Sequence, residues 1–130
     1  MKSWSDSDLY VVREMGRVFL SEGRCSLARQ VFRGLVALDP SDSYAQSGLG
    51  MALIQLGEFE AADQALAEAI RLDPEDWTAA LHLAEFRLRR GISPAARDAA
   101  QLAERATRAN HCPADVRRRA EYIVRIHQRA

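Results

Sequence analysis

The chain has 130 residues, the size of one small domain, and its 18 basic and 18 acidic side chains give a formal net charge of zero. This balance argues against an overall electrostatic attraction to nucleic acid or to an anionic membrane. Two cysteines do not make a disulfide framework, and we find neither a secretory signal nor a segment long enough to span a membrane, so we expect a reduced, cytoplasmic protein without membrane insertion.

Helix signals follow one another along the whole chain. Ser5 and Asp8 form an S-x-x-D capping pattern, which predicts a first helix from about residue 5 to about residue 22. Later helices are expected over about 26–38, from a cap at Ser41 or Asp42 to 56, over 59–72, after Pro74, and from Ser93-Pro94, where Pro occupies the first helical position. Residues 110–113 then break the pattern before a seventh helix over about 114–129.

Small residues recur along these helices with a period of 34 residues. Turns that need a positive φ carry Gly23, Gly57 and Gly91. Five residues later, a small side chain lets paired helices pack closely at Ala28, Ala62 and Ala96. The same reason applies to the helix crossings at Gly16, Gly50 and Ala84. The first two units end in a proline that cannot continue the preceding helix, at Pro40 and Pro74.

A helix–turn–helix unit with this period is typical of tetratricopeptide repeats. We therefore predict an all-α fold, a solenoid of three repeats at about residues 9–42, 43–76 and 77–110, in a single domain spanning 1–130. The last predicted helix, 114–129, carries Val116, Ala120, Ile123 (or Val124) and His127 on one side. Such a helix can cover the open end of a solenoid, and a separate binding role is the alternative.

The first helix of each repeat in this architecture faces the hollow of the solenoid. Positions 2, 5, 9 and 12 of the three repeats are Tyr10, Arg13, Arg17 and Leu20; Tyr44, Ser47, Met51 and Ile54; and Thr78, Leu81, Glu85 and Leu88. Tyrosine and methionine suit pockets for apolar side chains, so the strongest candidates for ligand contact are Tyr10, Tyr44, Met51 and Leu81. The alternative for position 12 is packing between helices. Only the first repeat is cationic in this set, which argues against a clamp for an acidic chain terminus.

No catalytic or cofactor signature accompanies the repeats. The three histidines lack a second ligand at metal-binding spacing, and the glycines follow the repeat period rather than a phosphate-binding loop, so we expect neither an enzyme nor a bound metal or cofactor. Residues 39–85 hold ten acidic residues and one basic, whereas 87–130 hold eleven basic and four acidic. These charges are interpreted as solvated helix faces; the alternative is a contact between protomers or with a polarised partner.

Residues 11–104 resemble the small tetratricopeptide chaperones of bacterial type III secretion, in particular those that protect hydrophobic translocators. The resemblance is carried by ARQVFRGL at 28–35, LD at 38–39 with DS at 42–43, SGLGMA at 47–52, LGEF at 56–59 and HLAEFRL at 82–88. It implies that the groove holds an extended apolar segment of a secreted client in the cytoplasm. It also implies a possible homodimer, although the N-terminal segment that the family usually uses for self-association is short here.

Two other functions are alternatives to the chaperone hypothesis. The first is a tetratricopeptide scaffold that joins subunits of a bacterial assembly without chaperone activity. The second is nucleic-acid binding by the arginine-rich end, which is disfavoured because Tyr122 is the only aromatic residue there for base stacking.

Overall fold

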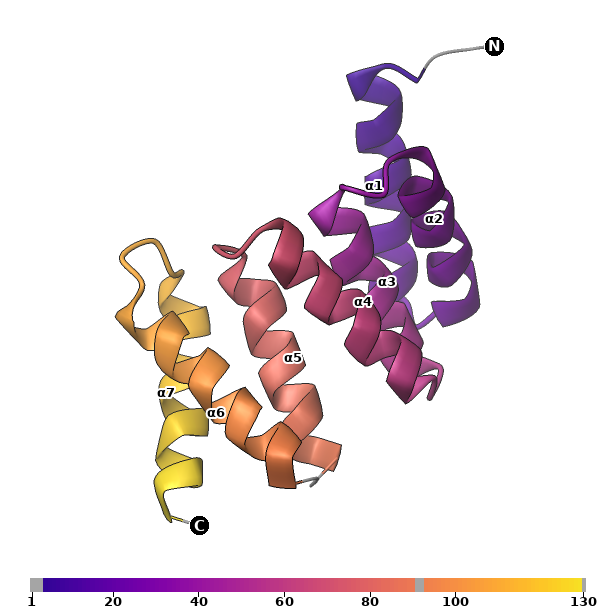
Figure 1. The fold of residues 1–130 in the computed structure, drawn as a ribbon. Coiled ribbons are helices and arrows are strands. Elements are labelled where there is room, and N and C mark those ends of the chain that lie inside the picture. The colour runs from indigo at the N-terminus through magenta and orange to yellow at the C-terminus, as the bar shows by residue number, and fades with distance from the viewer. Residues whose placement is uncertain (1–3, 91–92, 130) are drawn as a thin grey trace. The chain divides into compact units, whose positions relative to one another are not determined.

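The computed structural model describes residues 4–90 and 93–129, with side chains at 4–90 and 101–126. These residues form seven α-helices and no strand, which confirms the predicted all-α class (Figure 1). The chain folds as two compact units, Met1–Leu72 and Asp73–Ala130. The first contains α1 (Asp6–Ser21), α2 (Cys25–Leu38), α3 (Ser43–Gln55) and α4 (Phe59–Leu72), and the second α5 (Trp77–Arg90), α6 (Ser93–Arg108) and α7 (Ala114–Arg129). One domain of three repeats stays a prediction, because the first two repeats belong to the first unit and the third to the second.

Helices α1 and α3 start where the sequence supplies a capping side chain, whereas Arg24 before α2 makes no such hydrogen bond. Ser5 Oγ accepts from the Asp8 N–H at 3.1 Å, and Asp8 Oδ2 accepts from the Ser5 N–H at 3.0 Å, so the predicted capping box is formed. Asp42, rather than Ser41, caps α3 by accepting from the Ala45 N–H at 3.2 Å. These local hydrogen bonds satisfy amide groups that have no partner within the helix.

Two helices of the first unit end in the same glycine turn. Gly23 and Gly57 have φ values of +73° and +79°. After α1, the Arg24 N–H donates to the Phe19 carbonyl at 2.8 Å and the Gly23 N–H to the Leu20 carbonyl at 3.1 Å, and the same pattern follows α3. This is the Schellman arrangement, which needs a residue in the left-handed region and so favours glycine. Gly91 lies outside the described residues, as does the side chain of Ala96.

The first unit is held together by close contacts between glycines and large side chains. A Cβ atom at Gly16 would lie 2.7 Å from the Phe32 ring, and one at Gly48 would lie 2.3 Å from it. The ring of α2 therefore occupies the space that both glycines leave on α1 and α3. At Gly50 the corresponding distance is 2.7 Å, to Leu66 of α4. Ala28 and Ala62 are fully buried, which fits a crossing where helices pack at short distance.

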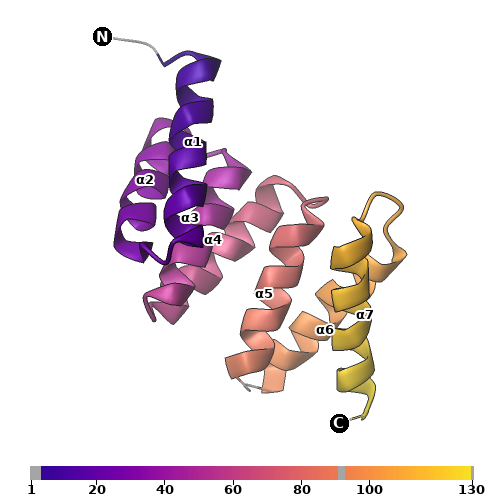
Figure 2. The ribbon, with the colours of Figure 1, turned by 180° about the vertical axis from the view of Figure 1, so that it is seen from behind.

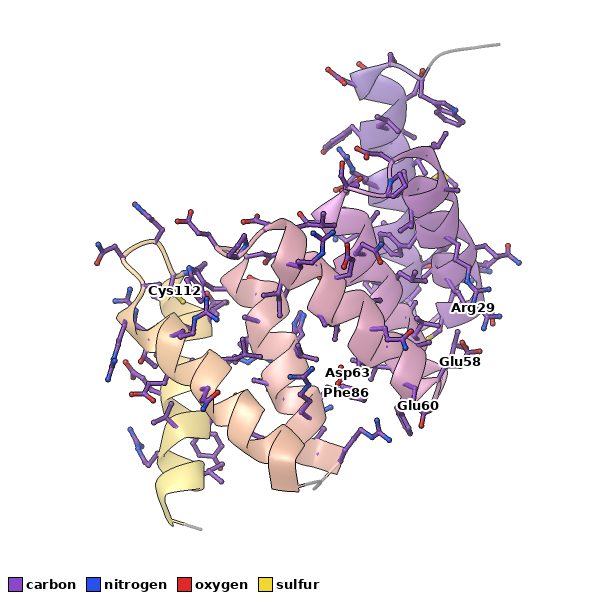
Figure 3. All side chains as sticks on the ribbon, viewed as in Figure 1. Arg29, Glu58, Glu60, Asp63, Phe86 and Cys112 are labelled. Atoms are coloured by element: carbon purple, nitrogen blue, oxygen red, sulfur yellow. The ribbon has the colours of Figure 1, made fainter. Side chains whose placement is uncertain are left out.

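Helices of the first unit lie side by side in both views (Figures 1 and 2). Besides its apolar core, the unit has an ion pair between α2 and the turn before α4, where Arg29 Nη1 lies 2.7 Å from Glu58 Oε1 (Figure 3). Both side chains are partly exposed, so this pair adds little stability by itself. The apolar contacts around Phe32 and Leu66 therefore carry the packing.

The second unit has a core shared by its three helices. Leu81 and Ala84 of α5 cluster with buried side chains of α6, of α7 and of the loop between them: Ala103, Ala106, Cys112, Val116, Ala120 and Ile123. The outer side of α7 exposes Arg118, Tyr122 and Arg125. Thus α7 buries the apolar side that the sequence predicts and turns a mostly polar side to solvent; the His127 side chain lies outside the described residues.

No helix in the described part of the chain combines the length and the apolar character needed to cross a bilayer.

The Phe32 contact yields a stability prediction with a matched control. Gly48→Ala should lower the free energy of unfolding by about 1–3 kcal/mol, because the new methyl group collides with a buried ring. Gly34→Ala is the control, since Gly34 is exposed within α2 and no heavy atom lies within 4 Å of an added Cβ. That variant should gain about 0.5–1 kcal/mol from reduced backbone entropy. Chemical denaturation measures both, and an equal gain at the two positions would contradict the packing argument.

Candidate functional site

The predicted groove residues of the first unit come together on α1 and α3. The Arg13 guanidinium carbon lies 6.0 Å from the centre of the Tyr44 ring, which brings the two helices into contact on this side. Tyr10 is 64% exposed and Tyr44 is 42% exposed. We call the face formed by Tyr10, Arg13, Arg17, Tyr44, Ser47 and Met51 the α1/α3 face. Ser47 and Met51 are half-buried and follow Tyr44 by one and two turns of α3.

One side of the Tyr44 ring packs against the core, and the ring is otherwise exposed to solvent. Its ring meets Phe32 edge-on, with ring centres 6.1 Å apart and planes at 61°. This geometry is favourable for aromatic pairs and anchors the ring against the core. Partial burial raises the pKa of the Tyr44 hydroxyl, with a further contribution from Glu14. The ring therefore stays neutral at physiological pH and offers a partner an apolar surface with a hydroxyl at its edge.

Both arginines on the α1/α3 face are already bound to carboxylates. Arg13 Nη2 donates to Asp42 Oδ2 at 2.8 Å, which raises the pKa of Arg13 further above its usual range and ties α1 to the start of α3. Arg17 donates to Glu14 Oε2 from Nη2 at 2.9 Å and from Nε at 3.1 Å. A carboxylate ligand would have to displace these acids. The face is therefore better suited to an apolar segment than to an acidic terminus.

A cavity of about 330 Å³ adjoins this face at the ends of α1 and α2. Its walls combine apolar and charged side chains: Trp4, Leu9, Leu35, Leu38, Arg13, Asp39 and Asp42. Arg13 Nε is buried and has no hydrogen-bond partner among the described residues. Hydrogen bonds from Ser41 lower the pKa of Asp39 and keep that carboxylate charged.

Sequence reasoning missed this cavity, although a local signal was available. Trp4 precedes the Ser5 cap and Leu9 is the fourth residue of the helix that follows. These are the two positions of a hydrophobic staple, which brings an entering chain against the first turns of a helix. The pattern therefore places Trp4 and Leu9 together, whereas the contributions of α2 depend on tertiary packing.

The groove prediction for the third repeat needs correction. Leu81, named among the strongest contact candidates, is only 1% exposed and belongs to the core of the second unit. Leu88 packs against the same core, and Glu85 accepts from Arg119 of α7 at 2.7–3.1 Å. Thr78 alone of the four is exposed. The physical reason is α7, which packs beside α5 and covers the positions that a bare repeat would leave open.

His82 lies half-buried on α5, close to the same ion pair. Burial lowers the pKa of His82; Glu85 and Asp76 oppose this effect, and Arg119 adds to it. Its Nδ1 atom is buried without a hydrogen-bond partner in the described part of the chain. The neutral imidazole is therefore the form that the folded second unit favours.

The described side chains include possible metal ligands and two free thiols. No cluster of three or more His, Cys, Asp or Glu residues that could hold a metal occurs among them. Cys25 and Cys112 are free thiols, and Cys25 Sγ lies 2.7 Å from Gln55 Oε1. The two open tyrosines and the adjoining cavity are the features that a ligand could use.

Comparison with known proteins places these features in a known fold. Residues 19–81 match the tetratricopeptide repeat family model. Comparison with curated protein sequences found no relative of significant similarity. Among solved structures, the Yersinia enterocolitica type III secretion chaperone SycD in complex with a peptide of the translocator YopD is 21% identical, with a TM-score of 0.82 over 96% of this chain and 95% of that one.

Two further structures are similar over different lengths. PcrH, solved in complex with the chaperone-binding region of PopD, is 23% identical, with a TM-score of 0.78 over 99% of this chain and 98% of that chain. MamA (41-end) from Desulfovibrio magneticus is 28% identical, with a TM-score of 0.67 over 74% of this chain and 55% of that chain. The predicted tetratricopeptide fold is thereby confirmed.

Leu81→Ala should lower the free energy of unfolding by about 2–5 kcal/mol, because it leaves a cavity beneath α7. Thr78→Ala, an exposed change on the same helix, is the control and should be nearly neutral. Denaturant titration followed by circular dichroism compares them. A small loss at Leu81 would mean that α7 does not cover α5 in solution.

The His82 environment predicts a pH dependence. The pKa of His82 is 6.5 in the unfolded chain and lower in the folded chain, so the folded chain binds fewer protons. The neutral His82 therefore contributes fully to stability above pH 6.5. This contribution is lost as the pH falls from 6.5 through the lower pKa of the folded chain. The free energy of unfolding should therefore drop between about pH 7.5 and about pH 5.5.

The substitution His82→Gln should reduce this drop, whereas the same change at the exposed His111 should leave it in place. Denaturant titrations at the two pH values provide the measurement. An unchanged slope in His82→Gln would assign the pH dependence to other groups.

Proposed function

We propose that this chain, which carries tetratricopeptide repeats, is a chaperone of a bacterial type III secretion system. In this proposal it binds an extended apolar segment of a secreted client in the cytoplasm and keeps the client soluble before export. It acts by binding alone, with neither catalysis nor a cofactor, and its partner is a protein rather than nucleic acid or a membrane.

The observation that carries the proposal is the open aromatic surface of the α1/α3 face. Tyr10 and Tyr44 expose large rings, and the Phe32 contact holds Tyr44 in place before any ligand binds. A fixed ring loses little conformational entropy on binding, so apolar contacts with it are efficient. The half-buried Met51 adds an adaptable side chain two turns along α3.

The ligand class follows from charge as well as shape. Since Asp42 and Glu14 neutralise Arg13 and Arg17, the α1/α3 face does not select for an acidic ligand. An extended segment with apolar side chains can place one of them against the tyrosines and another in the adjoining cavity.

The structural relatives support the same class of client. SycD and PcrH were each solved with part of a translocator, YopD and PopD respectively. Their identity to this chain is only 21–23%, so the likeness extends to the fold and no further. The proposed client of this chain therefore rests on the α1/α3 face. Of the third repeat, only Thr78 remains a candidate for client contact.

The test is capture of the client with a face variant and a matched control. The variant combines Tyr10→Ala and Tyr44→Ala; the control is Leu27→Ala, which removes a partly exposed apolar side chain from α2. Tagged proteins are used to capture partners from the cells that produce the chain, and mass spectrometry identifies them. The double variant should bind the client at least about tenfold more weakly, since buried tyrosines at interfaces are commonly worth more than 1 kcal/mol.

The captured client is then expressed alone and together with the chain. It should be insoluble alone and soluble in the presence of the wild-type chain, and the double variant should fail to keep it soluble although circular dichroism shows it folded. Partners that are soluble alone, or that bind the double variant as well as the control, would contradict the chaperone proposal and favour a scaffold that binds through another surface.

A further inference from the structure

The cavity beside the α1/α3 face has an apolar floor and apolar walls. Its volume is about 330 Å³, at the lower end of the range of about 300–1,000 Å³ that ligand pockets cover. Trp4, Leu9 and Leu38 line it together with Leu35, which is only 2% exposed. Trp4 and Leu38 remain more than half exposed, so water reaches these two walls. A guest with an apolar body would remove that contact with water.

The two carboxylates of the cavity differ in their partners. Asp42 forms an ion pair with Arg13, the only base among the described residues that line the cavity, and it also caps α3 through the Ala45 N–H. Asp39 uses only Oδ1, which accepts from the Ser41 N–H at 3.0 Å and from the Ser41 hydroxyl at 2.6 Å. Asp39 Oδ2 has no hydrogen-bond or ion-pair partner in the described part of the chain. One base and two acids therefore leave the lining with a net negative charge, and that charge is open at Asp39.

The Asp39 carboxylate stays ionised in this position. The hydrogen bonds from Ser41 lower the pKa of Asp39, and the charge of Arg13 makes a smaller contribution in the same direction. Hydroxyl and amide groups stabilise a carboxylate but carry no charge, so its negative charge remains. Because Asp39 is exposed, Oδ2 is a charged acceptor that a guest can reach beside apolar walls.

Apolar, acidic and basic guest side chains would meet this cavity differently. A wholly apolar side chain would cover the walls but take water from Asp39 without giving it a donor, which costs free energy. An acidic side chain would meet Asp39 and Asp42, while Arg13 is already paired. A basic side chain combines an aliphatic stem with a cationic end and so suits both parts of the cavity. Its cation can also lie against the indole of Trp4, since tryptophan binds cations better than other aromatic side chains.

We propose that this cavity binds a basic side chain, lysine or arginine, of the client segment. The stem packs against the leucines, and the cationic end donates to Asp39 Oδ2 beside the Trp4 indole. Arg13 lines the cavity and also lies 6.0 Å from the centre of the Tyr44 ring, so one extended segment can reach both places. This inference rests on the proposed function and narrows it, because the client then has an apolar residue for the tyrosines and a basic residue for the cavity.

The second repeat supplies a matched control for Asp39. One period of 34 residues later, Asp73 occupies the same turn before Pro74, and its Oδ1 accepts from the Glu75 N–H at 3.1 Å. Asp73 is not among the residues that line the cavity. Asparagine at either position keeps the acceptor oxygen of the turn and removes the charge. Asp39→Asn therefore tests the charge at the cavity, and Asp73→Asn tests the general effect of the same change.

The first experiment uses the full chain with small probes in place of the client. The probe n-butylammonium has the heavy atoms of a lysine side chain, 1-butanol is its neutral counterpart, and butyrate is an acidic one. Titrations at low salt are followed by ¹H–¹⁵N NMR at the Trp4 indole and at the amides of Leu38, Asp39 and Ser41. Bound n-butylammonium should shift these signals with an affinity at least about threefold above that of 1-butanol, and butyrate should not bind. Asp39→Asn should abolish the preference, and Asp73→Asn should retain it.

The inference is overturned if n-butylammonium shifts only signals elsewhere, if it binds no more tightly than 1-butanol, or if Asp39→Asn keeps the preference. Once a client is captured, the basic residues of its bound segment are replaced by methionine one at a time. Asp39→Asn should weaken binding of the unaltered client at least about threefold and leave binding of one such client variant unchanged.

The two proposals fail in different ways. A client that depends on Tyr10 and Tyr44 but not on Asp39 would support the proposed function and overturn the inference about the cavity. A chain that prefers n-butylammonium in the probe titration but captures no client would overturn the proposed function, while the preference of the cavity for a basic group would stand.

Discussion

The packing of the Phe32 ring against Gly16 and Gly48 is the contact on which the α1/α3 face depends. Because Gly16 and Gly48 have no side chain, the ring of α2 reaches the backbones of both α1 and α3. That closeness brings Arg13 within 2.8 Å of Asp42 and gives Tyr44 an aromatic partner beneath it. A core contact of α2 thus fixes the exposed Tyr44 ring on α3. The candidate binding residue Tyr44 is positioned by packing rather than by a loop.

The arginines of the α1/α3 face are neutralised by neighbouring carboxylates. The two arginines that could attract an anion donate to Asp42 and Glu14 of the same unit. In the second unit, Arg119 and Glu85 form a similar pair between α7 and α5. Ion pairs at such partly exposed positions add little stability, but they fix the direction of long side chains. For the proposed client site, this means that aromatic area rather than net charge discriminates between ligands.

The helices could be predicted from the sequence because local patterns determine where they begin and end. Ser5 and Asp8 form a capping box within four residues, and Gly57 ends α3 through hydrogen bonds to the preceding turn, so short patterns identify both. Leu81 was misassigned for the opposite reason. Whether its side chain meets solvent or core depends on α7, which begins more than 30 residues later in the chain. A repeat register places Leu81 on the inner side of α5 and contains no information about what covers that side.

Helices α1 and α7 differ in how much of their apolar surface is buried. Every repeat leaves an apolar face that must be covered by a neighbour. At the C-terminal end, α7 buries Val116 and Ala120 against α6 and α5 and turns arginines outward, so the apolar surface that remains is confined to Tyr122 and Ile126. At α1, by contrast, valines stand where α3 has buried alanines, and no described helix covers them. Contact of water with these valines, Val11 and Val18, costs free energy in proportion to the exposed apolar area.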